Sequence, residues 1–128
     1  MSLVLNTTDG PINLLCVYAP TLTSLDEVKD RLYSSVESII RIFSKDENLI
    51  ILGDFNSHVS SDNEARPRPL GNFGVRKYNG NGRRLLELCS FFDLCVTNTF
   101  FSTGKCHRVS WRHPRFKHWH QLDLILMR

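Results

Sequence analysis

The sequence lacks the features that mark membrane, secreted and low-complexity proteins. No apolar run approaches the ~20 residues that a membrane-spanning helix needs. The start, MSLVLNTTDG, turns polar by Asn6 and holds no basic group, so it does not resemble a secretory signal. The four cysteines stand at irregular spacings, which favours a reducing compartment inside the cell over a disulfide framework. With 128 residues, of which 41% are hydrophobic, the chain is expected to form a single globular domain.

Acidic residues are also missing between Asp93 and Asp123. Residues 1–64 carry 4 Lys/Arg and 10 Asp/Glu, a balance of −6, whereas residues 65–128 carry 12 and 3, a balance of +9. In the acid-free interval, basic side chains alternate with aromatic rings, which is typical of a surface that binds a polyanion. The alternative is a solvated face whose acidic partner lies elsewhere in the fold, among residues 1–64. The residues predicted to contact nucleic acid are Arg108, Arg112, Arg115 and Lys117.

The first half of the chain reads as strand, strand, helix, strand. Two apolar segments, 2–6 and 12–18, flank a turn at Asp9-Gly10-Pro11 and predict two strands. Ser24 and Glu27 have the spacing of a capping box, and an apolar stripe at helical spacing follows them. The short run 49–52 predicts a strand that is buried on both faces. This order of elements predicts a strand–helix–strand crossover.

The second half contains a long irregular segment, one helix and several short strands. Residues 57–80 hold three glycines and two prolines and predict a loop. The segment Asn79-Gly80-Asn81-Gly82 reads as a turn that feeds a helix over 82–92. Strands are expected near 94–98, 108–111 and 121–127. The whole pattern predicts a mixed α/β (α+β) domain.

Three polar groups follow the strand at 49–52. Asp54, Asn56 and His58 alternate with other residues, so they leave the same side of the chain if the strand continues past Gly53. Functional side chains in open α/β sheets gather just beyond the carboxyl ends of such strands. The alternative is that residues 54–56 form an Asx-type turn with no further role.

Four segments in order carry a family resemblance: VYAPT (17–21), GDFNSH (53–58), NTFF (98–101) and HQLDLIL (120–126). Together they resemble the endonuclease/exonuclease/phosphatase superfamily, which includes DNase I-like enzymes. Within that superfamily they are most similar to the endonuclease domain of LINE-type retrotransposons. The resemblance implies a partial DNase I-like β-sandwich with flanking helices. Residues 1–128 would then be a single truncated domain that lacks the N- and C-terminal parts of the family domain.

The resemblance also implies roles for individual residues. Tyr18 matches the tyrosine that faces the scissile phosphate, and Asp54 matches the carboxylate that orients or deprotonates the attacking water. Asn56 matches an amide that holds the phosphate or nucleophile, and Asp123 matches the carboxylate that supports the catalytic histidine. The implied cofactor is Mg²⁺, because a hard divalent cation binds carboxylate and phosphate oxygens together. The implied partner is DNA, in the nucleus rather than the cytoplasm, and no membrane is expected.

The chain departs from the family at several functional positions. The metal-binding glutamate and the Ser-Asp-His segment of the family are not found, and Thr21 stands where many relatives have an asparagine. The sequence therefore predicts an incomplete copy of a Mg²⁺-dependent DNA endonuclease, inactive alone, with no metal ligand assigned. The alternative is a non-catalytic remnant that binds nucleic acid or a protein. The missing N-terminal strand would leave a sheet edge open to self-association.

The remaining histidines and tryptophans allow two further predictions. His58 is interpreted as a loop residue rather than a replacement base, because geometry must precede such a role. Trp111 is expected in the core, since it continues an alternation from Val109. A zinc site is an alternative reading of Cys106, His113, His118 and His120, although their spacing matches no standard pattern.

Overall fold

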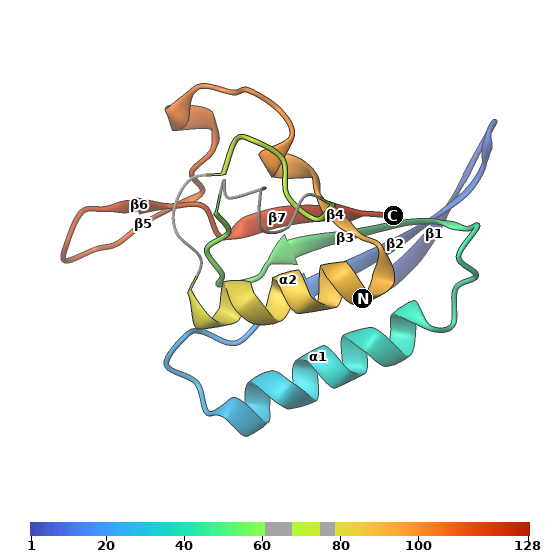
Figure 1. Cartoon of the computed structure of the whole chain (residues 1–128), viewed down its shortest axis with the longest axis horizontal. Helices are drawn as coiled ribbons and strands as arrows, with labels where there is room; N and C mark the ends of the chain where they lie inside the picture. The colour runs from blue at the N-terminus through green and yellow to red at the C-terminus, as the bar shows by residue number, and fades with distance from the viewer. Residues whose placement is uncertain (61–67, 75–78) are drawn as a thin grey trace.

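Five strands form one mixed sheet in the order β1-β2-β3-β7-β4 (Figure 1). The structure is a computed structural model that describes residues 1–60, 68–74 and 79–128. β2 and β3 run parallel, and the other neighbours in the sheet are antiparallel. The strands are β1 (Ser2–Thr7), β2 (Gly10–Tyr18), β3 (Asn48–Asp54), β4 (Cys95–Val96) and β7 (Asp123–Met127).

Two helices lie on the same side of this sheet (Figure 1). α1 (Asp26–Ile40) connects the parallel strands β2 and β3, which confirms the predicted crossover. α2 (Gly80–Phe92) follows the irregular segment and packs beside α1. Both helices direct apolar side chains onto the sheet. Cys89 in α2 belongs to this core, and its burial raises the pKa of the thiol to about 12. The predicted mixed α/β fold with flanking helices is confirmed.

The sheet has one covered face and one open face. Alternate residues of the central strands are buried under the helices, namely Leu15, Val17, Leu49, Ile51, Leu124 and Leu126. The residues between them point to the opposite face. On that side the register aligns Leu14 with Ile50 and Met127, and all three are half-buried or exposed. The open face is therefore largely apolar.

The helix starts differ from their sequence predictions. α1 has Leu25 at its N-cap position and no side-chain capping bond, so the predicted capping box at Ser24 and Glu27 is wrong. Ser24 instead closes a turn: its N–H donates to the carbonyl of Thr21, and the two hydroxyls lie 3.2 Å apart. α2 begins two residues earlier than expected, because the side chain of Asn79 accepts a hydrogen bond from the N–H of Gly82.

The C-terminal third contains short elements that the sequence predicted only in part. The strand expected at 94–98 is reduced to β4, because the 3₁₀ turn η1 (Thr97–Thr99) begins directly after it. A second 3₁₀ turn, η2 (Lys105–His107), follows. β5 (Trp111–Arg112) and β6 (Trp119–His120) form a separate two-stranded hairpin. The prediction that Trp111 is buried is wrong, since it is 42% exposed. The alternation that suggested burial belongs to a hairpin that projects away from the sheet (Figure 1).

The predicted loop at 57–80 is described only in part, because residues 61–67 and 75–78 lie outside the described residues. Its described residues are not all on the surface. Val59 and Leu70 belong to the core, and the N–H of Gly71 donates to the hydroxyl of the buried Thr99. In the part of the chain that the structure describes, no helix is long and apolar enough to cross a membrane.

Candidate functional site

Tyr18, Asp54 and Asp123 form one row across three neighbouring strands. Tyr18 pairs with Asp54 in the parallel register of β2 and β3, and Asp54 pairs with Asp123 in the antiparallel register of β3 and β7. Paired residues point to the same face of a sheet, with their strands about 5 Å apart. Leu124 and Phe55, which follow the two aspartates, are buried under the helices, so the row lies on the open face. The antiparallel direction predicted for the last strand is confirmed.

Asp54 also closes a turn, as the alternative reading of this stretch expected. Its Oδ1 accepts the backbone N–H of Asn56 at 2.8 Å, and Asn56 has a left-handed φ of 45°. The side-chain amide of Asn56 donates to the carbonyl of Ala19 at 2.8 Å. Asn56 therefore ties the loop after β3 to the end of β2, and so it holds Asp54 and Tyr18 in fixed relation. β3 ends at Asp54, so the expected continuation of the strand through Asn56 and His58 is wrong, and the turn of the alternative reading is confirmed.

Gly53 allows β3 to approach β2 closely at this edge. Its φ is +146°, which side chains rarely tolerate, and a Cβ atom at this position would lie 1.8 Å from the carbonyl oxygen of Val17. Any side chain at Gly53 would force β3 away from β2 immediately before the row. The glycine is therefore a condition for the register that places Tyr18 beside Asp54.

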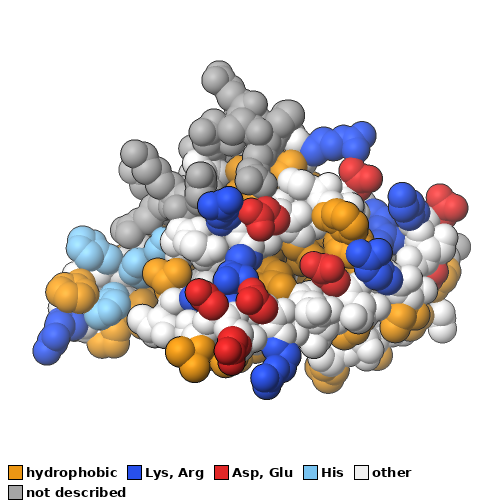
Figure 2. Space-filling model, turned by 60° about the horizontal axis from the view of Figure 1, so that its bottom comes forward, with side chains coloured by type: hydrophobic (Ala, Val, Ile, Leu, Met, Phe, Trp, Pro, Cys, Tyr) orange, Lys and Arg blue, Asp and Glu red, His pale blue; other side chains and the backbone are white. Residues whose placement is uncertain are grey.

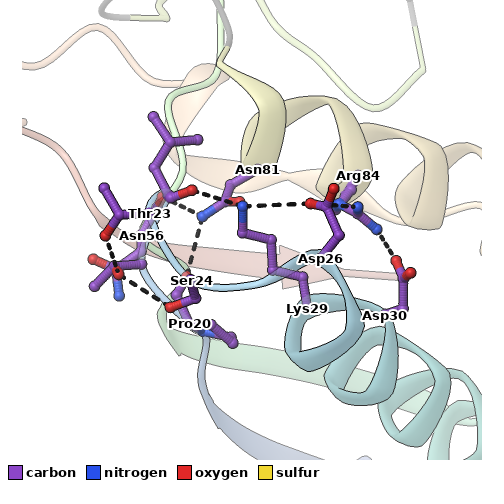
Figure 3. Close-up of polar contacts among 11 residues, drawn as sticks. Pro20, Thr23, Ser24, Asp26, Lys29, Asp30, Asn56, Asn81 and Arg84 are labelled. Carbon is purple, nitrogen blue, oxygen red and sulfur yellow. Dashed lines mark hydrogen bonds and ion pairs between the residues drawn. The ribbon is translucent and has the colours of Figure 1, made fainter.

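The first turn of α2 holds both loops of the site (Figure 3). Asn81 is 2% exposed, and its amide donates to the carbonyl of Pro20 at 3.1 Å and to the carbonyl of Asn56 at 3.0 Å. Gly82 lies directly against the backbone of His58, because an added Cβ would be 2.0 Å from that carbonyl oxygen. The helix thereby fixes the loops that follow Tyr18 and Asp54.

Ion pairs join α1 to α2 near these loops (Figure 3). Arg84 pairs with Asp30 and, at 3.3 Å, with Asp26. The hydrogen bond that Arg84 donates to Asp30, together with the charges of both carboxylates, raises the pKa of Arg84. The ammonium group of the buried Lys29 donates to the carbonyl of Leu22 at 2.7 Å. These contacts lie on the helix side of the sheet and serve to position the loops.

The β5–β6 hairpin carries three of the four predicted nucleic-acid contacts. Arg112, Arg115 and Lys117 are all exposed on it. The guanidinium of Arg112 lies 5.7 Å from the ring centre of Trp119, which is 51% exposed. Figure 2 shows histidine, basic and hydrophobic side chains gathered at the left end, where Figure 1 places this hairpin. Arg108 lies outside the hairpin, and its Nε donates to the carbonyl of Thr103.

The base of the hairpin adjoins the row. The hydroxyl of Ser110 accepts the N–H of Leu122 at 3.2 Å and the N–H of Asp123 at 3.3 Å. A second link joins the hairpin to the loop after Asp54: His120 Nδ1 lies 3.0 Å from His58 Nε2, and the two rings are stacked. Sequence reasoning missed this histidine pair, because its members are 62 positions apart and no local pattern relates them.

Two of the four candidate zinc ligands, His113 and His120, have other side-chain contacts in the structure. Nδ1 of His113 accepts the N–H groups of Arg115 and Phe116 within the hairpin turn, and His120 contacts His58. Among the described residues, no group of three or more His, Cys, Asp or Glu side chains is arranged to hold a metal ion. Asp54 and Asp123 could therefore hold a metal ion between them only if further ligands came from groups other than the described residues, such as a substrate phosphate or water.

Comparison with known proteins identifies two relatives. The chain is similar to craniofacial development protein 2 of Bos taurus, with 34% identity over 120 residues, and to that of Tragulus javanicus, with 32% identity. Each match covers 92% of this chain, which spans only 20% and 21% of the two relatives. A likeness to this protein is predicted by four segments together, and the comparison confirms it: VYAPTLTS, LGDFNSHV, NGRRLLELCSFFDLCVTNTFF and VSWRHPRFKHWHQLDLIL. No family model matches the chain.

We expect Asn81→Ala to lower the free energy of unfolding by about 2–3 kcal/mol, because it leaves the half-buried carbonyls of Pro20 and Asn56 without their donor. The exposed Asn48 supplies a control, and Asn48→Ala should change stability by less than about 0.5 kcal/mol. Urea unfolding followed by circular dichroism measures both. Equal stability of the two variants would contradict the role given to Asn81.

Proposed function

We propose that this chain carries the phosphate-facing part of a DNA endonuclease site of the DNase I-like type. In this proposal a DNA phosphodiester lies on the row of Tyr18, Asp54 and Asp123, and the β5–β6 hairpin holds the adjacent backbone. The observation that carries the proposal is the register of three neighbouring strands, which aligns a hydroxyl and two carboxylates beside an exposed basic hairpin. A DNA substrate would place this activity in the nucleus.

The charges of the row call for a cation. Two carboxylates on paired strands repel each other when both are ionised, and a phosphodiester adds a further negative charge. Mg²⁺ binds such oxygen donors through one or two carboxylates, substrate phosphate and retained water. Asp54 and Asp123 fit this donor set, because both lie on the open face at paired positions. When bound, Mg²⁺ would neutralise charge on the non-bridging oxygens of the phosphate.

The residues of the row have separate roles in the proposal. One oxygen of Asp54 accepts the N–H of Asn56, so the other is available to orient an attacking water. Tyr18 is 76% exposed, and its hydroxyl can donate to a phosphate oxygen. Asp123, at the start of β7, would share the cation. Asn56 acts through its contact with Ala19, which fixes the geometry of the other groups.

Catalysis by this stretch alone is expected to be weak. Among the described residues there is no third carboxylate or histidine grouped with Asp54 and Asp123 as a metal site. The second candidate function, non-catalytic binding of nucleic acid, is favoured by that same observation. The two candidates share the basic hairpin and differ in whether the row participates in chemistry.

Replacing Arg112, Arg115 and Lys117 together by alanine should weaken DNA binding. Three fewer phosphate contacts should reduce the slope of log affinity against log salt by about 2–3. Fluorescence anisotropy with a labelled duplex, over a range of salt concentrations, measures both the affinity and the slope. The proposed binding should be independent of DNA sequence.

The control for this experiment removes the same charge from the other side of the molecule. Arg31, Arg41 and Lys45 lie on or just after α1 and are exposed, so their triple alanine variant should keep the slope of the unmodified chain. An equal loss in both triple variants would show that only net charge matters. A flat salt dependence in the unmodified chain would contradict DNA binding by the hairpin.

Supercoiled plasmid incubated with this chain and Mg²⁺ should be nicked at or near the background rate. The absence of a general acid–base alone costs about 10²–10⁴-fold in rate. Agarose gel analysis of relaxed plasmid measures the rate, with EDTA and Asp54→Ala as controls. Rapid nicking that EDTA stops and Asp54→Ala abolishes would show that the described residues suffice for catalysis.

A further inference from the structure

β1 forms one edge of the sheet and pairs with β2 alone. All six of its residues are exposed, including Leu3, Val4 and Leu5. The β1–β2 hairpin extends beyond the helices at the right of Figure 1. Among the residues that the structure describes, no strand pairs with the outer side of β1.

The register shows which backbone groups of β1 face outward. Met1 and Cys16 exchange both backbone hydrogen bonds, at 2.7 and 3.2 Å. In an antiparallel pair, hydrogen-bonded and non-hydrogen-bonded positions alternate. Leu3, Leu5 and Thr7 therefore bond inward to β2, and the N–H and C=O groups of the residues between them face outward. These outward residues are Ser2, Val4 and Asn6.

The edge lacks the devices that usually prevent strand pairing. Natural edge strands carry charged side chains, proline or bulges that discourage a further strand. Residues 2–7, SLVLNT, contain no charged residue and no proline, and their pairing with β2 runs without interruption. Leu3 and Leu5 are aligned with Leu14 and Ile12, so their side chains extend the apolar open face to the outer edge.

We propose that the outer edge of β1 pairs antiparallel with β1 of a second copy of this chain. A two-fold axis at Val4 sets Val4 opposite Val4 of the partner, and Ser2 opposite Asn6. All three outward-facing residues then meet outward-facing residues, so each copy satisfies the free backbone groups of the other. On the open face, Leu3 comes beside Leu5 of the partner. Because the segment is uncharged, no like charges meet across the axis.

The pairing makes one continuous sheet from both copies and leaves the rows of Tyr18, Asp54 and Asp123 accessible. The row lies on β2, β3 and β7, away from the outer edge of β1. The inference is therefore independent of the proposed nuclease site, and either can hold without the other.

Val4→Pro tests the pairing directly. Proline removes the outward N–H of Val4 and leaves the inward bonds of Leu3 and Leu5 to β2 intact. Each dimer loses two hydrogen bonds across the axis, so its dissociation constant should rise about tenfold or more. Val4→Thr keeps the N–H and the β-branched shape and should dimerise like the unmodified chain. Sedimentation velocity from low micromolar to near-millimolar concentration measures the dimer, and circular dichroism checks the fold.

A second variant and a second measurement cover the case in which Val4→Pro does not fold. Val4→Lys places like charges at the axis and should shift the chain to monomer. Hydrogen exchange by NMR should show that the amides of Ser2, Val4 and Asn6 become protected as concentration rises, whereas those of Leu3 and Leu5 are protected throughout. A chain that stays monomeric over the whole range would overturn the inference. So would a dimer that persists in folded Val4→Pro, since its interface would lie elsewhere.

Discussion

The close approach of β3 to β2 at Gly53 is the constraint on which the rest of the site depends. A Cβ at this position would overlap the carbonyl oxygen of Val17, so the two strands reach this distance only with glycine. The parallel register that results brings the end of β2 level with the end of β3. Tyr18 and Asp54 then stand side by side, and the loops that leave both strands meet within reach of one amide, that of Asn81.

The sheet has one face that is covered by the helices and one face that is open to ligands. The helices cover one face with a continuous core, and the ion pairs of Arg84 hold them together beside the loops. The open face carries apolar rows that end in the polar row of Tyr18, Asp54 and Asp123. The hairpin is joined to that polar end by Ser110 and by the contact between His58 and His120. The chemistry that we propose therefore uses the open face, whereas the pairing of β1 uses the outer edge of the sheet.

Sequence patterns predict those elements of the fold that depend on neighbouring residues alone, such as turns and buried strands. The turn at Asp9-Gly10-Pro11 and the apolar run 49–52 were sufficient for β1, β2 and β3, because turn residues and buried strands have distinct compositions. The cap of α1 was mispredicted because Thr21 competes for Ser24 in a turn. Trp111 was mispredicted because a period of two does not show whether a strand packs on a core. The histidine pair has no local signature, since tertiary folding alone brings His58 to His120.

In the proposed endonuclease function, Asp54 and Asp123 share one cation at a DNA phosphate. A crystal structure of the chain with Mn²⁺ and a short deoxyoligonucleotide tests it most directly, because the anomalous signal of Mn²⁺ locates the ion. We expect a peak that contacts both carboxylates, with a phosphate oxygen within hydrogen-bond distance of the Tyr18 hydroxyl. Mn²⁺ bound away from both aspartates, with phosphates only on the β5–β6 hairpin, would contradict it and favour the non-catalytic function.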